Sequence, residues 1–371
     1  MSNARELAQI PSTPSGRRNL IINGAMNVAQ RGTAAATGLT QADDGYKTVD
    51  RWQCIISGTS TNSGQITMSY ETDAPDNFKY STKYLVTTAD TDMGSDGSLR
   101  LETHLEAQDV RHLNYGSSDA KQVTLSFWVK SNKTGSYSAG LYMDSVASGS
   151  DNEISQGYTI TSANTWEYKT LTFAPNTTTV MNATDNDHGL RAWFFQAAGS
   201  NTTGGSSNTW GNSSNRTVGQ SVNLYDTVNN YWQITGVQLE VGSVATEFEH
   251  RSFGEELALC QRYYFATETD VSGQPLMGYG VALSTTAVDF NFTLPMTMRA
   301  APTITGLRLK LSLAGGTAYN ATFSYGIGYQ SGDSTNVRIG VNASGLTTHR
   351  PYFIRNQTGT GQSYIRFDAE L

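Results

Sequence analysis

YWQITGVQLEVGSVATEFEHRSFGEELALCQRYYF, residues 231–265, contains the end of one expected domain and the start of another. Residues 231–241 alternate apolar and polar side chains, which predicts a strand with one buried face. The alternation slips at Gly236, and a glycine inside a strand indicates a β-bulge. Gly242 and Ser243 then end the strand. The side chains expected on the buried face are Trp232, Ile234, Val237, Leu239 and Val241.

From Ser252 onward the apolar period changes to that of a helix. Ser252 is a favourable N-cap, and Glu255 follows three residues later, as a capping box requires. The apolar stripe of this helix consists of Phe253, Leu257, Cys260 and Tyr264. We therefore expect a linking helix within residues 251–269, helical over 252–265, that positions two β domains and recognises no ligand.

The composition is that of a β-rich protein with many tight turns. Charged residues make up 15 % of the chain and there are 36 glycines, which argues against a helical bundle. A net charge of −7 leaves no basic surface for phosphates, so nucleic acid is not an expected partner. No apolar run approaches about 18 residues and no secretory signal is visible, so neither membrane insertion nor secretion is expected. The two cysteines, Cys54 and Cys260, are expected to be buried free thiols.

Short alternating segments recur along the whole chain with no helical segments between most of them. This spacing predicts an all-β fold: a jelly-roll β-sandwich and a smaller C-terminal β domain, joined by one short α-helix. The expected strands lie at 20–22, 49–57, 65–71, 83–88, 98–105, 123–129, 136–143, 156–160, 166–173, 190–197 and 231–241, then at 278–294, 303–313, 322–329, 336–342, 350–354 and 364–369. The expected parts are an N-terminal attachment segment (1–19), the jelly roll (20–250), the linking helix (251–269) and a C-terminal β knob (270–371).

Four blocks carry a resemblance to a known family: NLIINGAMNVAQRGT (19–33), VDRW (49–52), VTLSFWVKS (123–131) and ITGVQLEVGSVATEFEHRSFGEELALCQRYY (234–264). They resemble the bacteriophage tail-fibre family typical of marine phages and prophages. The first 250 residues are also similar, more distantly, to the carbohydrate-binding jelly rolls of polysaccharide-degrading enzymes. The resemblance implies a virion tail component, assembled in the host cytoplasm and commonly a homotrimer, that recognises a host surface glycan. It also implies that the N-terminal segment docks on other tail proteins.

A glycan site needs flat apolar rings for the C–H faces of sugars and polar groups for their hydroxyls. Trp210 lies in a long polar loop, where it is either a stacking platform or an anchor for that loop. Trp166 and Tyr168 share one face of a strand, which is either core or an exposed sheet surface. In the C-terminal domain the candidates are Tyr319, Tyr325, Tyr329 and Tyr352, with packing or subunit contacts as the alternative. The remaining strand tryptophans, Trp52, Trp128, Trp193 and Trp232, are expected to be core.

No motif in the sequence predicts catalysis or a metal site. There is no nucleophile elbow, phosphate loop or dinucleotide fingerprint, and the five histidines have no zinc-ligand spacing. Asp185-Asn186-Asp187 resembles part of a calcium loop, but Ala25 follows the Asn23-Gly24 turn where the carbohydrate-binding relatives often have an acidic residue. No cofactor is expected beyond an optional structural calcium ion. The function that the resemblance implies is that of a virion tail-fibre protein that binds a host surface glycan, and a structural tail adaptor or a polysaccharide depolymerase are the alternatives.

Overall fold

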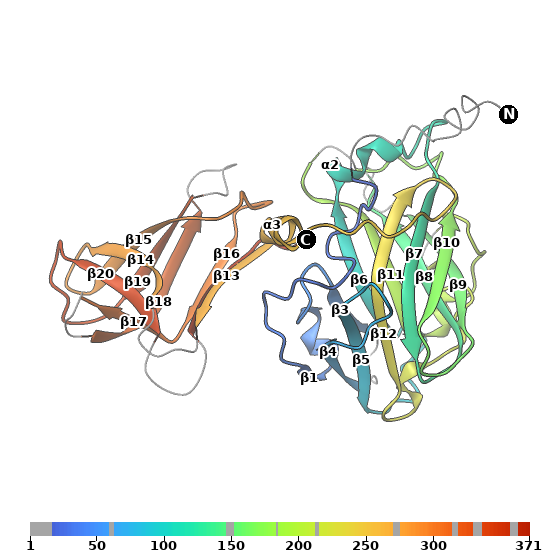
Figure 1. Cartoon of the computed structure of the whole chain (residues 1–371), viewed down its shortest axis with the longest axis horizontal. Helices are drawn as coiled ribbons and strands as arrows, with labels where there is room; N and C mark the ends of the chain where they lie inside the picture. The colour runs from blue at the N-terminus through green and yellow to red at the C-terminus, as the bar shows by residue number, and fades with distance from the viewer. Residues whose placement is uncertain are drawn as a thin grey trace. The chain divides into compact units, whose positions relative to one another are not determined.

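The computed structural model describes residues 17–58, 63–145, 152–182, 185–211, 215–269, 275–313, 318–328, 336–356 and 363–371. The chain forms two compact units, residues 1–251 and 252–371 (Figure 1). The predicted attachment segment, residues 1–19, lies outside the described residues except for its last three.

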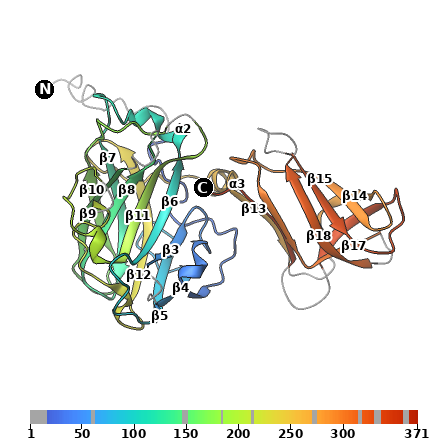
Figure 2. The ribbon, with the colours of Figure 1, turned by 180° about the vertical axis from the view of Figure 1, so that it is seen from behind.

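The first unit is a jelly-roll β-sandwich of two six-stranded antiparallel sheets, which Figure 2 shows from behind. Sheet A has the order β1 (Ala36–Leu39), β4 (Gln65–Glu71), β5 (Ser81–Thr88), β12 (Tyr231–Val241), β7 (Val123–Ser131) and β10 (Glu167–Phe173). Sheet B has the order β2 (Gly45–Tyr46), β3 (Gln53–Ser57), β6 (Ser98–Glu106), β11 (His188–Ala198), β8 (Gly135–Met143) and β9 (Asn152–Ile160). Among the described residues, the short helical segments of the first unit include α2 (Ala107–Val110) and 3-10 turns at Gln41–Asp43, Arg111–Leu113, Ser200–Thr202 and Leu224–Asp226.

The period-2 pattern of the strands produces the core of the sandwich. Every second residue of β7 is fully buried, and the residues between them face away from the core. Large rings fill the space between the sheets: Phe194 lies 6.1 Å from Trp52 and 6.2 Å from Trp232, measured between ring centroids. The predicted core positions of Trp52 and Trp232 are thus confirmed. Trp193 is also buried, but it lies opposite Glu102 on the outer face of sheet B and not between the sheets, so the core position predicted for it is wrong.

β12 is also the strand against which the first described residues of the chain, 17–24, fold; we call these residues the N-terminal segment. The amide of the buried Asn19 side chain donates to the Val237 carbonyl (3.0 Å), and its oxygen accepts the Leu239 N–H (3.1 Å). The backbone of 20–22 forms bends and turns, so the strand predicted there is wrong. This apolar run is held on β12 by the Asn19 side chain and by two separate backbone hydrogen bonds, from the Leu20 N–H to the Leu239 carbonyl (2.8 Å) and from the Val237 N–H to the Gly24 carbonyl (2.9 Å), instead of by a continuous strand ladder.

The predicted bulge at Gly236 is confirmed. The pairing of β12 with β7 shifts between Thr235 and Gln238, and Gly236 has a φ of +61°. A glycine adopts this left-handed conformation without steric cost, so the bulge is encoded locally.

The second unit combines a closed six-stranded barrel with a three-stranded sheet, so the smaller C-terminal β domain is also confirmed. The barrel consists of β14 (Pro275–Ala282), β15 (Ala287–Thr293), β19 (Asn336–Asn342), β18 (Ala318–Gly328), β17 (Leu309–Ser312) and β20 (Pro351–Asn356). The sheet consists of β13 (Tyr264–Thr269), β21 (Ser363–Asp368) and β16 (Thr303–Leu307). The long strands predicted at 278–294 and 303–313 are each two strands. The second of them breaks at Arg308, whose φ is +54°.

The predicted linking helix is shorter than its apolar spacing suggested. The helix α3 (Phe253–Gln261) begins at Ser252, whose hydroxyl accepts the Glu255 N–H (3.3 Å), so the predicted N-cap is confirmed. It ends before Tyr264, which begins β13, because pairing with β21 replaces the last helical turn. Phe253 is 61 % exposed, so the predicted apolar stripe is wrong at its first residue, and Tyr264 is buried but belongs to β13 and not to the helix.

Both cysteines are buried thiols with no disulfide between them, as predicted. Within the described residues, no helix has the length and apolar character needed to cross a membrane.

Gly24→Ala is predicted to lower the free energy of unfolding by about 1–3 kcal/mol, the usual cost of overpacking. A Cβ at Gly24 would lie 2.0 Å from the Val237 carbonyl oxygen, so the N-terminal segment would be forced off β12. Denaturant unfolding measures the change. Gly204→Ala is the matched control, since nothing lies within 4 Å of its added Cβ. Equal stability of the two variants would contradict the close approach of Gly24 to β12.

Candidate functional site

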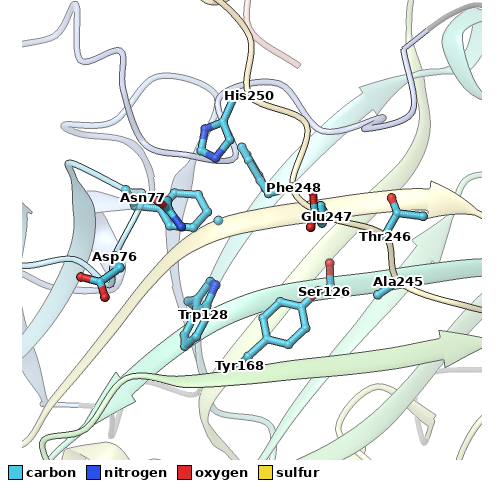
Figure 3. Close-up of a pocket in the computed structure, with 12 residues that line it drawn as sticks. Asp76, Asn77, Ser126, Trp128, Tyr168, Ala245, Thr246, Glu247, Phe248 and His250 are labelled. Atoms are coloured by element: carbon cyan, nitrogen blue, oxygen red, sulfur yellow. The ribbon is translucent and has the colours of Figure 1, made fainter.

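The outer face of sheet A carries two neighbouring aromatic rings. Because Phe127 and Val129 point into the core, Trp128 between them points outward. Tyr168 on β10 lies opposite Trp128 in register, with the ring centroids 5.3 Å apart and the planes inclined by 49°. Tyr168 is 45 % exposed and Trp128 is half-buried. Together the two rings form an apolar floor on the sheet (Figure 3).

The first wall above this floor is residues 243–251, which we call the corner segment. Glu240 of β12 accepts hydrogen bonds from the backbone N–H (2.8 Å) and hydroxyl (2.7 Å) of Thr246. The side-chain oxygen of Gln238 accepts the Glu249 N–H (2.8 Å), and its amide donates to Glu240 (2.9 Å). Both β12 side chains are buried under the segment. The chain therefore turns back over the outer face of the sheet that it has just completed.

The far end of the corner segment is fixed to the N-terminal segment. Arg251, whose side chain is 4 % exposed, donates to the backbone carbonyls of Asn19 and Ile21. Glu249 in turn accepts the backbone N–H of Asn19 (2.9 Å). Attached at both ends, the segment is a fixed wall of the site.

The second wall is the loop at 72–80, between β4 and β5. Phe78 of this loop lies over the bulge, where a Cβ on Gly236 would come within 2.6 Å of the Phe78 ring. Phe78 also contacts the corner segment: its ring centroid lies 5.0 Å from that of Phe248 and 5.3 Å from that of His250. The missing side chain at Gly236 thus lets the two walls meet above β12.

Asp73 ties the second wall to the sheet. Its carboxylate accepts hydrogen bonds from Lys130 Nζ (2.8 Å) and Trp166 Nε1 (3.3 Å). Burial raises the pKa of Asp73, but the hydrogen bonds from Lys130 and Trp166 outweigh it and leave this pKa below its usual value. Asp73 is therefore ionised near neutral pH.

Floor and walls enclose a groove of about 880 Å³. Figure 3 shows Trp128 and Tyr168 on neighbouring strands, with Thr246, Glu247 and Phe248 of the corner segment across β12 from them in this view. The lining residues are Asp76, Asn77, Phe78, Ser126, Trp128, Tyr168, Gly236, Ala245, Thr246, Glu247, Phe248 and His250.

This lining suits a molecule with one apolar face and a hydroxylated edge. Aromatic rings offer flat contact area to C–H groups, and the exposed side chains of Asp76, Asn77 and Glu247 offer hydrogen bonds. A concave, partly apolar site with few polar groups is the usual form of a small-ligand site.

Three residues of the sandwich were predicted to bind the ligand; one of them lies in the groove and one lies beside it. Tyr168 is on the floor, and Trp166 is half-buried against Lys130 on the same outer face, so the face they share is sheet surface and not core. Trp210 instead donates its indole N–H to the Ala174 carbonyl (2.7 Å) and packs edge-on against Tyr115, with ring centroids 5.6 Å apart. This geometry is that of a loop anchor, which is the alternative given above to a stacking platform; the effect of Trp210 on binding is tested below.

The structure gives different positions to the four predicted tyrosines of the second unit. Tyr352 is fully buried and its hydroxyl accepts the Thr347 N–H (2.8 Å), so it packs in the barrel core, which is the alternative given for it, and offers no surface to a ligand. Tyr319 is half-buried against that core, 6.0 Å from Tyr352 between ring centroids. Tyr325 lies on β18, where only the backbone is described, and Tyr329 lies outside the described residues. Ligand roles for Tyr319, Tyr325 and Tyr329 stay predictions.

Trp128 was expected in the core, and that expectation is wrong. Its position in a strongly apolar strand hid the fact that Val123, Leu125, Phe127 and Val129 already occupy the buried face. Strict alternation in VTLSFWVKS assigns Trp128 to the outer face with Ser126 and Lys130. The signal was present in the sequence. The walls, by contrast, depend on contacts between segments about 170 residues apart.

The outer face of sheet B carries a buried charged cluster whose members satisfy one another. Glu102 contacts Arg100 (2.6 Å) and His104 (2.9 Å). Burial raises the pKa of Glu102, but Arg100 and His104 hold it well below its usual range. Burial also lowers the pKa of His104, so the imidazole is neutral at pH 7. A paired, covered cluster of this kind is structural.

Within the described residues, no three His, Cys, Asp or Glu side chains gather so that they would hold a metal ion. Around the predicted calcium loop, the carboxylate of Asp185 accepts the Asp187 N–H (3.1 Å), and the Asp185 carbonyl accepts the Gln108 N–H (2.9 Å). A structural calcium ion there stays a prediction.

Comparison with family models and with curated proteins gives no match. Among solved structures, the chain is similar to the enzymatically active domain of tailspike protein 4 of bacteriophage CBA120, with 14 % identity and a TM-score of 0.32 over 60 % of this chain but 21 % of the tailspike chain. It is also similar to a family 11 carbohydrate-binding module of a Clostridium thermocellum cellulase, with 12 % identity and a TM-score of 0.28 over 58 % of this chain and 98 % of the module. A xylan-binding domain from Paenibacillus barcinonensis matches with 15 % identity and a TM-score of 0.28, over 52 % and 92 % of the two chains. The ligand of the groove is argued below from its own residues.

Asp73→Asn is predicted to destabilise the protein at pH 7 by about 0.2–1 kcal/mol, the usual worth of a partly exposed ion pair. The pKa of Asp73 is lower in the folded protein than in the unfolded chain, where it is about 3.9. The ionised carboxylate therefore stabilises the fold at pH values above this unfolded pKa. That contribution disappears as the pH falls through the folded pKa. Denaturant unfolding of both proteins at pH 7 and at pH 3 should show the difference shrinking on acidification. A constant difference would mean that the ionised Asp73 does not hold the loop.

Proposed function

We propose that this chain is a virion tail-fibre protein whose jelly-roll domain binds a host surface glycan in the groove on sheet A. The observation that carries the binding proposal is the paired floor of Trp128 and Tyr168 between two walls with polar side chains. The tail-fibre part rests on the four sequence blocks that resemble that family, above all residues 234–264.

The proposed mechanism is stacking combined with edge recognition. A sugar ring lays its C–H face on Trp128 and Tyr168, while Asn77, Asp76 and Glu247 bind its hydroxyls at the rim. The side chains on the floor come from strands, so little conformational entropy is lost on binding.

Binding at one groove is expected to be weak, and the virion gains strength from several copies. A homotrimer, as the sequence resemblance implies, presents three grooves, and effective concentration combines their affinities. The predicted attachment segment, residues 1–19, is proposed to attach the fibre to other tail proteins.

We propose that the protein is not an enzyme. A depolymerase is the second candidate, because Asp76 and Glu247 are two carboxylates in one aromatic groove and glycosidases use such pairs. The two functions differ in outcome, since an enzyme releases new reducing ends from the polysaccharide and a binding module leaves its length unchanged. A purely structural adaptor does neither.

Tyr168→Ala and Trp128→Ala are each predicted to weaken glycan binding about tenfold, since truncating a central aromatic contact costs on the order of 1–2 kcal/mol. Binding of purified protein to a glycan array, followed by titration calorimetry on the strongest ligand, measures the loss. Tyr168 is exposed, so its truncation should leave the fold intact.

Trp210→Ala is the matched control, predicted to lower the melting temperature while leaving binding unchanged, because Trp210 anchors a loop. The proposal fails if Trp210→Ala abolishes binding while Tyr168→Ala does not. Release of reducing ends from a bound polysaccharide would favour the depolymerase.

A further inference from the structure

The titratable side chains on the walls of the groove are two carboxylates and one imidazole. Of the twelve lining residues, Asp76 and Glu247 are acidic and His250 is the only one with a basic side chain. His250 packs against Phe78 and Phe248, with its ring centroid 4.9 Å from that of Phe248. Figure 3 shows Asp76 and Glu247 on either side of Trp128.

The nearby carboxylates that build the walls are already neutralised or capped, unlike these two. Asp73 forms an ion pair with Lys130, and Glu249 forms one with Arg251. The Glu240 carboxylate accepts hydrogen bonds from Thr246 and Gln238. Asp76 and Glu247 are exposed, and within the described residues their carboxylates have no hydrogen bond or ion pair. The nearest wall cation is Arg18, whose guanidinium donates to the Thr246 hydroxyl (2.9 Å) and to the Glu247 backbone carbonyl (3.4 Å) and not to a carboxylate of the groove. Their negative charge is therefore directed at whatever enters the groove.

An uncompensated carboxylate beside aromatic rings acts on a ligand through charge. Coulomb interaction is stronger next to low-dielectric walls than in bulk water, so an acidic substituent is repelled there. A protonated amine is attracted twice, by the carboxylates and by the negative face of the Trp128 ring. A neutral hydroxyl donates a hydrogen bond to the same carboxylates and gains no attraction between opposite charges.

We infer that the groove selects glycans without acidic groups and prefers a sugar that carries a protonated amine over its neutral counterpart. This rests on the proposed function, because it assigns the chemical class of the ligand to the same site. Uronic acids, sulfated sugars and phosphate-bearing repeats are excluded by Asp76 and Glu247.

A glycan array with neutral, amine-bearing and acidic oligosaccharides, probed with the full-length protein at pH 6, tests the inference. The bound set is expected to lack carboxylate, sulfate and phosphate groups. Amine-bearing members should bind about fivefold more tightly than neutral ones of the same backbone, as two exposed charge pairs would give. Raising the salt concentration should reduce binding of the amine-bearing members only.

The double variant Asp76→Asn/Glu247→Gln keeps the size and hydrogen-bonding groups and removes the charges. It should bring the amine-to-neutral ratio close to one and admit acidic oligosaccharides. Asp92→Asn/Asp119→Asn changes the net charge equally at exposed positions that do not line the groove and should behave as the native protein.

Two results overturn the inference, and they differ. Native protein that binds acidic glycans as tightly as neutral ones, or a groove variant with unchanged selectivity, contradicts the charge selection and leaves the proposed function standing. Native protein that binds no glycan contradicts the proposed function, and the inference with it.

Discussion

The hydrogen bonding of the corner segment to Gln238 and Glu240 is the interaction on which the site depends. A buried carboxylate without partners destabilises a protein by several kcal/mol, so Glu240 can be covered only if donors arrive from the segment above it. Thr246 supplies them with its backbone and its hydroxyl. The position of the first wall is therefore fixed by the stability of the sandwich itself, and the groove is rigid before any ligand arrives.

The strand that carries those two residues serves the fold and the site together. Its inner face fills the core with Trp232 and Ile234, and its backbone receives the N-terminal segment at Val237. The bulge at Gly236 resets the alternation and leaves an open place for Phe78. One strand thus sets the core, the anchorage of the N-terminal segment and the contact between the two walls of the groove.

Local sequence patterns predicted the strands and the bulge. The walls of the groove depend on side-chain contacts between distant segments, which such patterns do not reveal. Alternation located most strands, and a single glycine foretold the bulge, because both signals are local. The strand expected at 20–22 is absent because the buried Asn19 side chain and two separate backbone hydrogen bonds attach this segment to β12 in place of a continuous ladder. Trp210 was a ligand candidate because it is a tryptophan in a polar loop, but its indole N–H donates to the Ala174 carbonyl and so anchors that loop. Half of the floor, Tyr168, was predicted; the walls were not, since nothing near residue 78 points to residue 248.

The central claim is that the corner segment is a fixed wall of a glycan groove. Hydrogen–deuterium exchange, resolved to single amides, tests this claim most directly. In the free protein, the amides of Thr246 and Glu249 should exchange as slowly as those of sheet A, because they donate to Glu240 and Gln238. With the strongest array oligosaccharide added, residues 72–80 and 243–251 should slow further while residues 199–211 do not change. Exchange of the corner segment at the rate of an unstructured loop, or ligand protection confined to residues 199–211, would contradict the account.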